Sequence, residues 1–297
     1  MRAAEPTGSR PSRATRAASS PSTPVSRRAP RRARSPTPEI LEVEEARRLI
    51  EARALGREIV KVDAPDAWFL KRGLTPAAAR RALRGRMLTA ARRRGKQILL
   101  DTDGGAGPVL GLHLGMSGRV LVDGSEAGDP LIYASNRHVP AWVRFGLRFA
   151  DGGVLALRDP RRLGAVELEP DEARLGPDAM SLRLADLEPV LTRSRAPLKA
   201  VLMDQSRVAG LGNLLVDEVL FRSGLDPRRP AKSLDRDERR RLHRAIRATV
   251  RSLGRRGGSH TGDLPREVAV PCPRDGGPLV RQTVGGRTTY WCPVHQV

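Results

Sequence analysis

Four side chains near the C-terminus have the spacing of metal ligands. Cys272 and Asp275 form one pair with two residues between them, Cys292 and His295 form a second such pair, and a Gly285-Gly286 turn separates the pairs. This pattern resembles a zinc ribbon, in which four ligands hold Zn²⁺ in a tetrahedral array and stabilise a segment too small for its own core. The spacing predicts one Zn²⁺ per chain. The alternative is a metal-free hairpin with two buried cysteines.

A glycine-rich turn joins two helical patterns in the C-terminal half. The patterns span residues 197–204 and 213–223, and Gly210 and Gly212 lie between them. Asn213 stands where its side chain can cap the second helix, whose free backbone N–H groups would face a phosphate. The pattern fits a DNA-binding helix-turn-helix, and it also fits an ordinary helical hairpin.

The charge balance indicates a polyanionic partner. The 297 residues contain 54 Lys and Arg against 33 Asp and Glu, a formal net charge of +21. Nucleic acid is the first candidate, although charge alone also fits ribosomal RNA or an acidic membrane surface. Aromatic residues make up only 3% of the chain, which argues against a stacking platform for single strands. Two cysteines are too few for a disulfide framework, and this fits a reducing cytosol.

The first 37 residues differ from the rest of the chain. They hold nine arginines, one glutamate and six prolines, with no leucine, isoleucine or aromatic residue. Such a segment cannot bury a core, so we expect it to be disordered. The chain contains no stretch of about 18 uncharged apolar residues and no apolar segment of a secretory signal. We therefore expect a cytoplasmic protein, associated with the nucleoid when bound to DNA, that uses no membrane.

Six segments resemble the formamidopyrimidine-DNA glycosylase family, in the order of that family. The first segment, Leu198–Pro227, contains the glycine turn and is similar to the helix-two-turn-helix of that family. The other five segments are Pro38–Glu44 (PEILEVE), Arg94–Lys96 (RGK), His113–Arg119 (HLGMSGR), Asp159–Gly164 (DPRRLG) and Gly286–Cys292 (GRTTYWC). Each motif alone is weak, but six in register across residues 38–297 make coincidence negligible.

The resemblance implies a set of catalytic residues. Pro38 matches the family's N-terminal proline, whose secondary amine attacks the sugar C1′ and forms an iminium. Glu39 matches the acidic residue that donates a proton to the opening sugar. Lys96 would hold a phosphate near the lesion and assist elimination, and Arg287 would bind a phosphate and act in δ-elimination. Here the nitrogen of Pro38 lies in a peptide bond with Thr37, so imine formation requires a chain that begins at Pro38.

The resemblance also implies DNA contacts. His113 and Asn213 match phosphate-binding residues, which position DNA without reading its sequence. Met116, Arg161 and Leu163 match the residues that fill the void left by a flipped base. Leu163 stands where the family usually has a phenylalanine. The alternative role of Leu163 is that of an ordinary leucine in the apolar core. We also expect Arg162 and Arg195 to contact the DNA backbone. Residues 257–262 resemble the mobile loop that folds over the flipped base.

These residues predict a bifunctional DNA glycosylase and AP lyase of base excision repair, monomeric, that acts on damaged double-stranded DNA. Oxidised purines such as 8-oxoguanine and formamidopyrimidines are favoured over oxidised pyrimidines. A catalytically inactive DNA-binding relative is the main alternative, because of the Thr37-Pro38 peptide bond. A third candidate is a ribosome- or RNA-associated zinc-ribbon protein, which the charge alone supports.

The elements that must position these residues form an α+β multidomain chain. Helical spacing of apolar residues begins at Glu42 and ends at Gly56. Short strand patterns with Asp-Gly turns then predict an antiparallel β-sandwich with flanking helices. The predicted strands are residues 58–62, 97–101, 109–114, 119–122, 145–149, 154–158 and 164–168.

The C-terminal half is predicted to be helical. Helices are expected over residues 184–191, 197–204, 213–223 and 235–254, followed by the cysteine-bearing hairpin. The expected domains are a disordered extension (1–37), a catalytic β-sandwich (38–172), a helix-two-turn-helix domain (173–264) and a zinc-finger-like hairpin (265–297).

Overall fold

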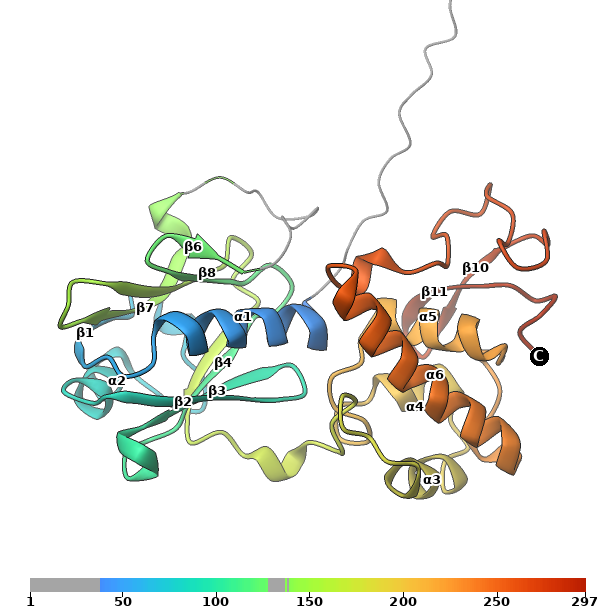
Figure 1. Cartoon of the computed structure of the whole chain (residues 1–297), viewed down its shortest axis with the longest axis horizontal. Helices are drawn as coiled ribbons and strands as arrows, with labels where there is room; N and C mark the ends of the chain where they lie inside the picture. Colours follow the sequence, from blue (N-terminus) through green and yellow to red (C-terminus); the bar gives the residue numbers. More distant parts are fainter. Residues whose placement is uncertain (1–37, 128–136, 138) are drawn as a thin grey trace, which may run out of the picture. The chain divides into compact units, whose positions relative to one another are not determined.

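A computed structural model describes residues 38–127, 137 and 139–297 (Figure 1). Residues 1–37, which we expect to be disordered, lie outside the described residues. Over the described ranges, no helix is long and apolar enough to cross a membrane.

Two antiparallel sheets form the first half of the described chain. One has the strand order β1-β7-β8-β5-β6, with strands Ile59–Asp63, Val143–Phe149, Val154–Arg158, Arg119–Val122 and Ser125–Glu126. The other has the order β2-β3-β4-β9, with strands Leu88–Arg94, Gln97–Thr102, Leu110–His113 and Ala165–Leu168. Buried side chains of both sheets belong to one apolar cluster. The predicted antiparallel sandwich is therefore confirmed.

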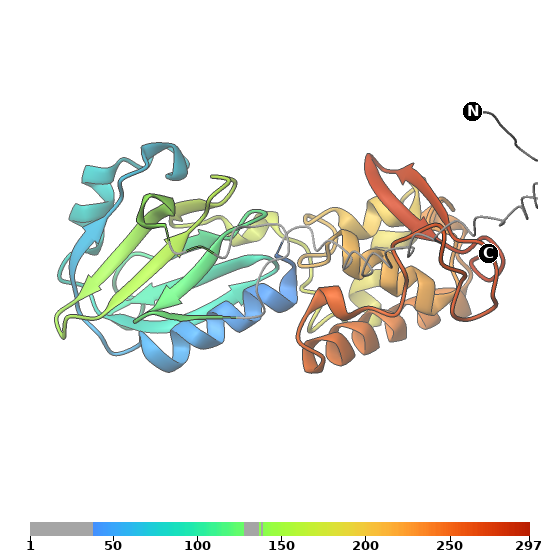
Figure 2. The same cartoon turned by 90° about the horizontal axis from the view of Figure 1, so that it is seen from above.

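Helix α1 (Ile40–Arg53) lies alongside both sheets and contacts β2, β3 and β5 (Figure 2). Val43 and Ile50 on α1 are buried in the core of the sandwich. Ile40 and Leu41, in the first turn, are buried in the core of the helical half instead. The helix therefore begins two residues before the predicted start, because its first turn packs on a different core.

Strand β2 and helix α2 (Pro76–Leu83) were not predicted. Only Leu88 and Ala91 of β2 are buried, and the strand ends in three arginines. Arg92 pairs with Asp101 on β3 at 2.8 Å, and Arg93 pairs with Asp178 of the helical half at 2.6 Å. Local apolar alternation could not reveal β2, because acidic partners from other segments hold its arginines.

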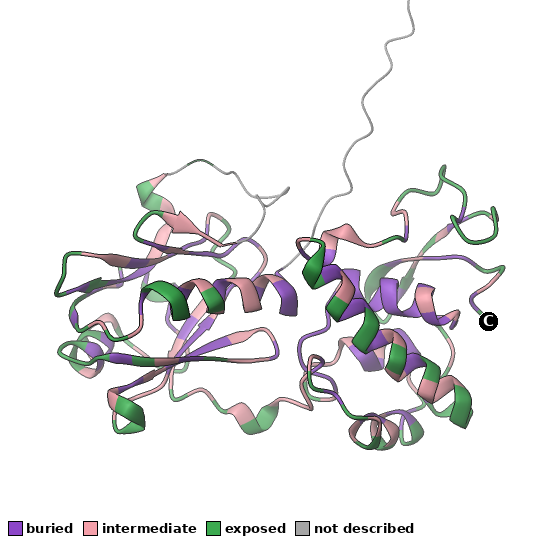
Figure 3. Ribbon diagram, viewed as in Figure 1, coloured by how far each residue is buried: buried purple, intermediate pink, exposed green. Residues whose placement is uncertain are grey.

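Four helices form the second half around their own apolar core. The predicted helices are confirmed within two residues at each end: α3 (Leu184–Thr192), α4 (Leu198–Met203), α5 (Asn213–Ser223) and α6 (Arg236–Arg255). Helix α5 is buried along most of its length, whereas one face of α6 is exposed (Figure 3). The N-cap Asp235 begins α6 by accepting a hydrogen bond from Glu238 N at 2.8 Å.

The C-terminal hairpin consists of β10 (Val280–Val284) and β11 (Arg287–Trp291), which pair around the predicted Gly285-Gly286 turn. Its small core includes Phe221 of α5 beside Cys272 and Cys292. One-turn 3-10 helices complete the described elements: η1 (Ala67–Phe69), η2 (Asp103–Gly105), η3 (Pro140–Trp142), η4 (Glu172–Arg174), η5 (Ala231–Ser233) and η6 (Ser259–Thr261).

Candidate active site

Glu39 joins the start of α1 to the start of α5. Its side chain is fully buried, and its carboxylate accepts backbone hydrogen bonds from Gly212 (3.0 Å), Leu214 (2.8 Å) and Leu215 (3.1 Å). These N–H groups have no partner within a helix, and the positive end of the helix dipole adds to their attraction. Pro38, the preceding residue, is buried as well. The two predicted catalytic residues at the start of the family-like segment thus lie at the N-terminus of α5.

The two glycines of the predicted turn allow this close approach. A Cβ on Gly212 would collide with the carboxylate of Glu39, and a Cβ on Gly210 would collide with the side chain of Ile40. Gly210 also has a φ of +108°, where a side chain is strained. The glycine turn predicted as a nucleic-acid motif therefore also contacts the N-terminus of α1, next to the predicted catalytic residues.

The prediction that Asn213 caps α5 is wrong. Asn213 is the first helical residue, and the N-cap is Gly212, which has no side chain to offer. The carboxylate of Glu39 takes the capping role across the turn. Asn213 instead donates from Nδ2 to the carbonyl oxygen of Thr288 on β11 at 3.0 Å.

Opposing effects act on the pKa of Glu39. Burial raises this pKa, because a carboxylate loses its hydration, and nearby Glu42 raises it further. The positive charge of Lys96 and the hydrogen bonds from α5 lower it. The net result is a pKa above the ordinary value, which increases the protonated fraction of this carboxyl group at a given pH.

Lys96 lies in the turn between β2 and β3. Burial lowers the pKa of its amine, the nearby charges of Glu39 and Glu42 oppose this, and Arg287 lowers the pKa further. Gly95 lets the turn approach the helical half: its φ is +56°, and a Cβ there would lie 3.0 Å from the Cβ of Ala209. The structure therefore brings three predicted catalytic residues, Glu39, Lys96 and Arg287, into one electrostatic cluster.

Asp178 holds this turn against the helical half. Its carboxylate accepts hydrogen bonds from Gly95 N at 2.8 Å and from Arg93 at 2.6 Å. The sequence reasoning missed this role, because an isolated aspartate 83 residues from Gly95 carries no local signal.

Arg287 is exposed at the start of β11. The following residues are held by the fully buried Lys199, which donates to Thr288 O (3.0 Å) and Thr289 Oγ1 (2.8 Å) and pairs with buried Asp217 at 2.6 Å. Asn213 and Lys199 thus anchor the strand that presents Arg287.

His113 lies at the end of β4, half-buried. Its Nδ1 accepts a hydrogen bond from Gly115 N at 3.0 Å. Burial and the neighbouring charge of Lys96 lower the pKa of His113, and Glu167 partly opposes them. The imidazole is therefore held neutral near the amine of Lys96, with its Nδ1 occupied by an N–H donor.

The predicted void-filling residues lie on two loops joined by one carboxylate. Buried Asp159 accepts hydrogen bonds from the hydroxyl of Ser117 and from the backbone N–H of Arg161 (3.1 Å) and Leu163 (2.8 Å). Met116, beside Ser117, is half-buried, and Leu163 is 46% exposed. Leu163 is therefore a surface side chain and not a core leucine.

The two expected backbone-contacting arginines have different surroundings. Arg162 makes a two-point ion pair with Asp66, with both distances at 2.6 Å. Arg195 is exposed in the link between α3 and α4 and forms no ion pair or side-chain hydrogen bond with any residue in the described ranges. Arg161 is also exposed.

Glu42 is a site residue that the sequence reasoning did not single out. Its carboxylate accepts from Glu39 N at 2.9 Å, and from the backbone N and the hydroxyl of Ser259 at 2.7 Å each. Ser259 begins η6, inside the expected mobile loop 257–262. Glu42 thus connects the catalytic end of α1 to that loop. Its place in the PEILEVE motif was the available signal.

The four predicted metal ligands come together at the base of the hairpin. One ligand atom from each of Cys272, Asp275, Cys292 and His295 lies within 4.8 Å of all the others. The Sγ of Cys272 lies 3.6 Å from Nδ1 of His295, and the Sγ of Cys292 lies 3.3 Å from Oδ2 of Asp275. Two sulfurs, one imidazole nitrogen and one carboxylate oxygen are a donor set that tetrahedral Zn²⁺ accepts. The cluster fits a bound zinc ion.

Comparison with known proteins agrees with this geometry. A family model for the formamidopyrimidine-DNA glycosylase N-terminal domain matches residues 37–166, and a model for the helix-two-turn-helix domain of that glycosylase matches residues 175–263. The formamidopyrimidine-DNA glycosylase of Paracoccus denitrificans is 36% identical over 293 residues, which cover 87% of this chain and 99% of that protein. The enzyme of that name from Thermus thermophilus is 34% identical over 291 residues, with 87% and 98% covered.

Solved structures of the Lactococcus lactis enzyme Fpg bound to DNA are similar to the chain. Its complex with abasic-site DNA has a TM-score of 0.74 at 25% identity and covers 88% of this chain and 100% of that one. Its complex with DNA containing an oxidised pyrimidine has a TM-score of 0.72 at 26% identity, with 87% and 99% covered. Together with the Glu39 site at the N-terminus of α5, these matches show that the chain is an enzyme of the formamidopyrimidine-DNA glycosylase family.

Proposed function

We propose that the protein excises oxidised bases from double-stranded DNA and then cleaves the strand at the abasic site, acting as a monomer. The observation that carries this proposal is Glu39. It is a buried carboxyl with a raised pKa, next to Pro38 and within the electrostatic reach of Lys96. This arrangement supplies a proton donor beside the family's nucleophile position.

The proposed reaction begins with the nitrogen of Pro38 as a free secondary amine. Its lone pair forms a bond to C1′, the bond from C1′ to the base breaks, and the base leaves with a proton. Glu39 donates a proton to the ring oxygen as the sugar opens to an iminium. The iminium acidifies C2′, whose proton is lost as the 3′ phosphate leaves, and the 5′ phosphate leaves in the following δ-elimination. Lys96 and Arg287 would hold the phosphates during both eliminations.

We propose oxidised purines as preferred substrates, with 8-oxoguanine and formamidopyrimidines first. The Lactococcus relative has been solved with DNA carrying either an oxidised pyrimidine or FAPY-dG, so the relatives leave both lesion classes as candidates. Parallel excision rates on duplexes of each class test the preference.

The peptide bond between Thr37 and Pro38 favours a second candidate, a DNA-binding relative without lyase chemistry. An amide nitrogen has no nucleophilic lone pair, so the first candidate requires a chain that starts at Pro38. Cleavage within an arginine-rich terminal segment is a physically accessible route to that start.

Borohydride trapping separates the two candidates. A protein that begins at Pro38 should form a covalent adduct with a duplex containing 8-oxoguanine, and the intact 297-residue chain should form none. If the shortened protein also fails to form an adduct while it still binds abasic DNA, the inactive relative is correct. Efficient trapping by the intact chain would assign the nucleophile to another amine. Lys96 is the first suspect, because its lowered pKa increases the neutral amine fraction.

A further inference from the structure

The exposed face of α6 carries a long row of arginines. The intervals between them are four, four, three, four and four residues, which keeps them on one face of a helix with 3.6 residues per turn. At a rise of about 1.5 Å per residue, the row is about 28 Å long. Its members are Arg236, Arg240, Arg244, Arg247, Arg251 and Arg255.

Most of these guanidinium groups have no acidic partner on their own helix; Arg240, which lies 3.7 Å from Asp237, is the exception. Arg244, Arg247, Arg251 and Arg255 are exposed, and none forms an ion pair or side-chain hydrogen bond within the described part of the chain. Residues 239–262 contain no aspartate or glutamate. Solvated basic helices usually interleave acidic residues, since like charges four residues apart destabilise a helix. The C-terminal part of the row therefore has no counter-charge from its own helix, and the nearest acidic side chains are Glu44 and Glu45 of α1, which line the same hollow as Arg247, Arg251 and Arg255.

The row lies on a different side of α5 from the strand that carries Arg287. Helix α6 packs its apolar face on α5, and β11, which carries Arg287, packs on α5 as well (Figures 1 and 2). The arginines lie on the face of α6 opposite its buried residues Leu242, Ile246 and Leu253. The row and Arg287 therefore face different sides of the helical half.

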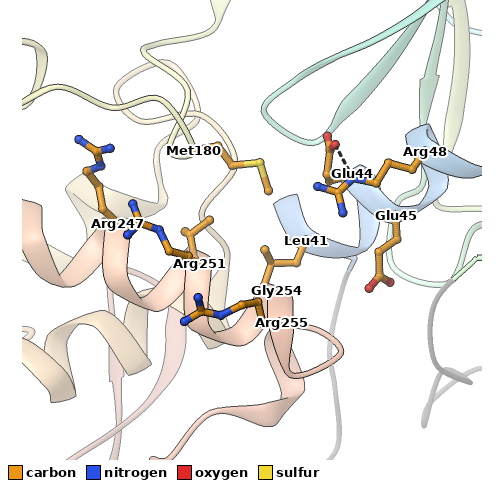
Figure 4. Close-up of a pocket in the computed structure, with 10 residues that line it drawn as sticks. Leu41, Glu44, Glu45, Arg48, Met180, Arg247, Arg251, Gly254 and Arg255 are labelled. Atoms are coloured by element: carbon orange, nitrogen blue, oxygen red, sulfur yellow. Dashed lines mark hydrogen bonds and ion pairs between the residues drawn. The ribbon is translucent and has the colours of Figure 1, made fainter. Parts of the chain in front are cut away.

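The extent of the row favours an extended polyanion. Arg247, Arg251 and Arg255 follow one another along one wall of a hollow of about 360 Å³ whose other wall includes Leu41, Glu44 and Glu45 of α1 (Figure 4). The remaining arginines continue along α6 beyond this hollow. A small anion could not neutralise a row of this length.

The chemistry of the face favours nucleic acid over protein. Protein interfaces concentrate aromatic and apolar side chains at their centre, whereas DNA interfaces are polar and strongly basic. Within the described residues, no exposed large apolar side chain lies on α6. Guanidinium groups also match phosphate oxygens in two-point hydrogen bonds.

We propose that the α6 arginine row binds the phosphate backbone of a second DNA segment while the active site holds the first. Two segments held at once would let the protein pass between neighbouring stretches of DNA without full release. This second site requires no base excision chemistry.

The test uses the full chain with its active site saturated by an unlabelled duplex that contains a tetrahydrofuran abasic analogue. Binding of a labelled undamaged duplex is then followed by fluorescence anisotropy over a series of salt concentrations. The row variant is R247Q/R251Q/R255Q. The control variant R53Q/R81Q/R84Q removes the same charge from three exposed arginines of the sandwich half that form no ion pair with described residues. Thermal unfolding checks that both variants are folded, and R251Q alone provides a milder change.

We expect the wild type and the control to bind the labelled duplex, and the row variant to bind at least tenfold more weakly. The slope of log affinity against log salt should fall by about 2 to 3 for three lost phosphate contacts. Equal binding by the row variant and the control overturns the proposal, as does a wild type that binds no second duplex. A labelled polyglutamate peptide that binds the row more tightly than the duplex would overturn it in favour of an acidic protein partner.

Discussion

Glu39 shows how one residue serves both architecture and chemistry. Three backbone N–H groups of α5 hold its carboxylate, while burial disfavours its charge. The hydrogen bonds fix its position, and burial keeps its pKa above the ordinary value. A carboxyl group of this kind is orientated before substrate arrives, and its raised pKa favours the protonated form that can donate.

This raised pKa predicts a specific pH dependence of stability. The folded chain binds the Glu39 proton more tightly than the unfolded chain, whose pKa is near 4.5. The contribution is therefore fully present below that pH and is lost as the pH rises through the folded pKa. The difference in unfolding free energy between wild type and E39Q should fall by up to about 1.4 kcal/mol per pH unit in that window.

Urea unfolding at several pH values between 4 and 8 measures this difference. The substitution E51Q, at an exposed carboxylate on the same helix, provides the comparison for loss of one surface charge. A difference between wild type and E39Q that stays constant across the window would contradict the raised pKa.

Arg287 is predicted to act on phosphates without regard to the base. Replacing it by alanine should weaken binding to damaged and undamaged duplexes alike and reduce the salt slope by about 1. Arg281, on the paired strand β10, is exposed and points to the opposite face of the hairpin, so R281A is the matched control. A loss confined to one lesion, or an equal loss in R281A, would show that Arg287 has another role.

At the scale of elements, the hairpin β10–β11 depends on contacts outside itself. Its core borrows Phe221 from α5, and Lys199 and Asn213 hold its second strand. A metal at the four-ligand cluster would close the other end of the segment, since the ligands come from both sides of the hairpin. Lys199 and Asn213 therefore hold the strand of Arg287, and a bound metal would add a second support.

The metal site makes a direct prediction. Purified protein should contain one Zn²⁺ per chain, and C292S should lose it, because three ligands hold zinc much less tightly than four. Loss of the metal should speed hydrogen exchange in residues 272–297 and weaken DNA binding by releasing Arg287. Elemental analysis measures the zinc content. Zinc-free protein with intact DNA affinity would show that the hairpin needs no metal.

At the scale of the whole molecule, α1 connects the two halves of the described chain. Its first turn is buried in the helical core and its later turns in the sandwich core. Glu39 and Glu42 lie at the junction, bound to the N-terminus of α5 and to the loop after α6. The catalytic start of α1 is therefore held by contacts from both halves.

Much of this organisation could be predicted from local pattern. Apolar periodicity identified α1, the four C-terminal helices and seven strands, because each of these elements buries one regular face. The motif segments predicted Glu39, Lys96 and Arg287 as site residues, and the paired spacing predicted the four residues that the structure gathers into one cluster. These features depend on residue type and on short separations along the chain.

Only the tertiary structure decided the rest. Strand β2 was missed because its arginines are neutralised by acids such as Asp178, 85 residues away. The cap of α5 comes from Glu39, 175 residues before Leu214, and not from Asn213. The link from Glu42 to Ser259 spans 217 residues. Such partners meet through packing of separate elements, so no local window of sequence contains the information that pairs them.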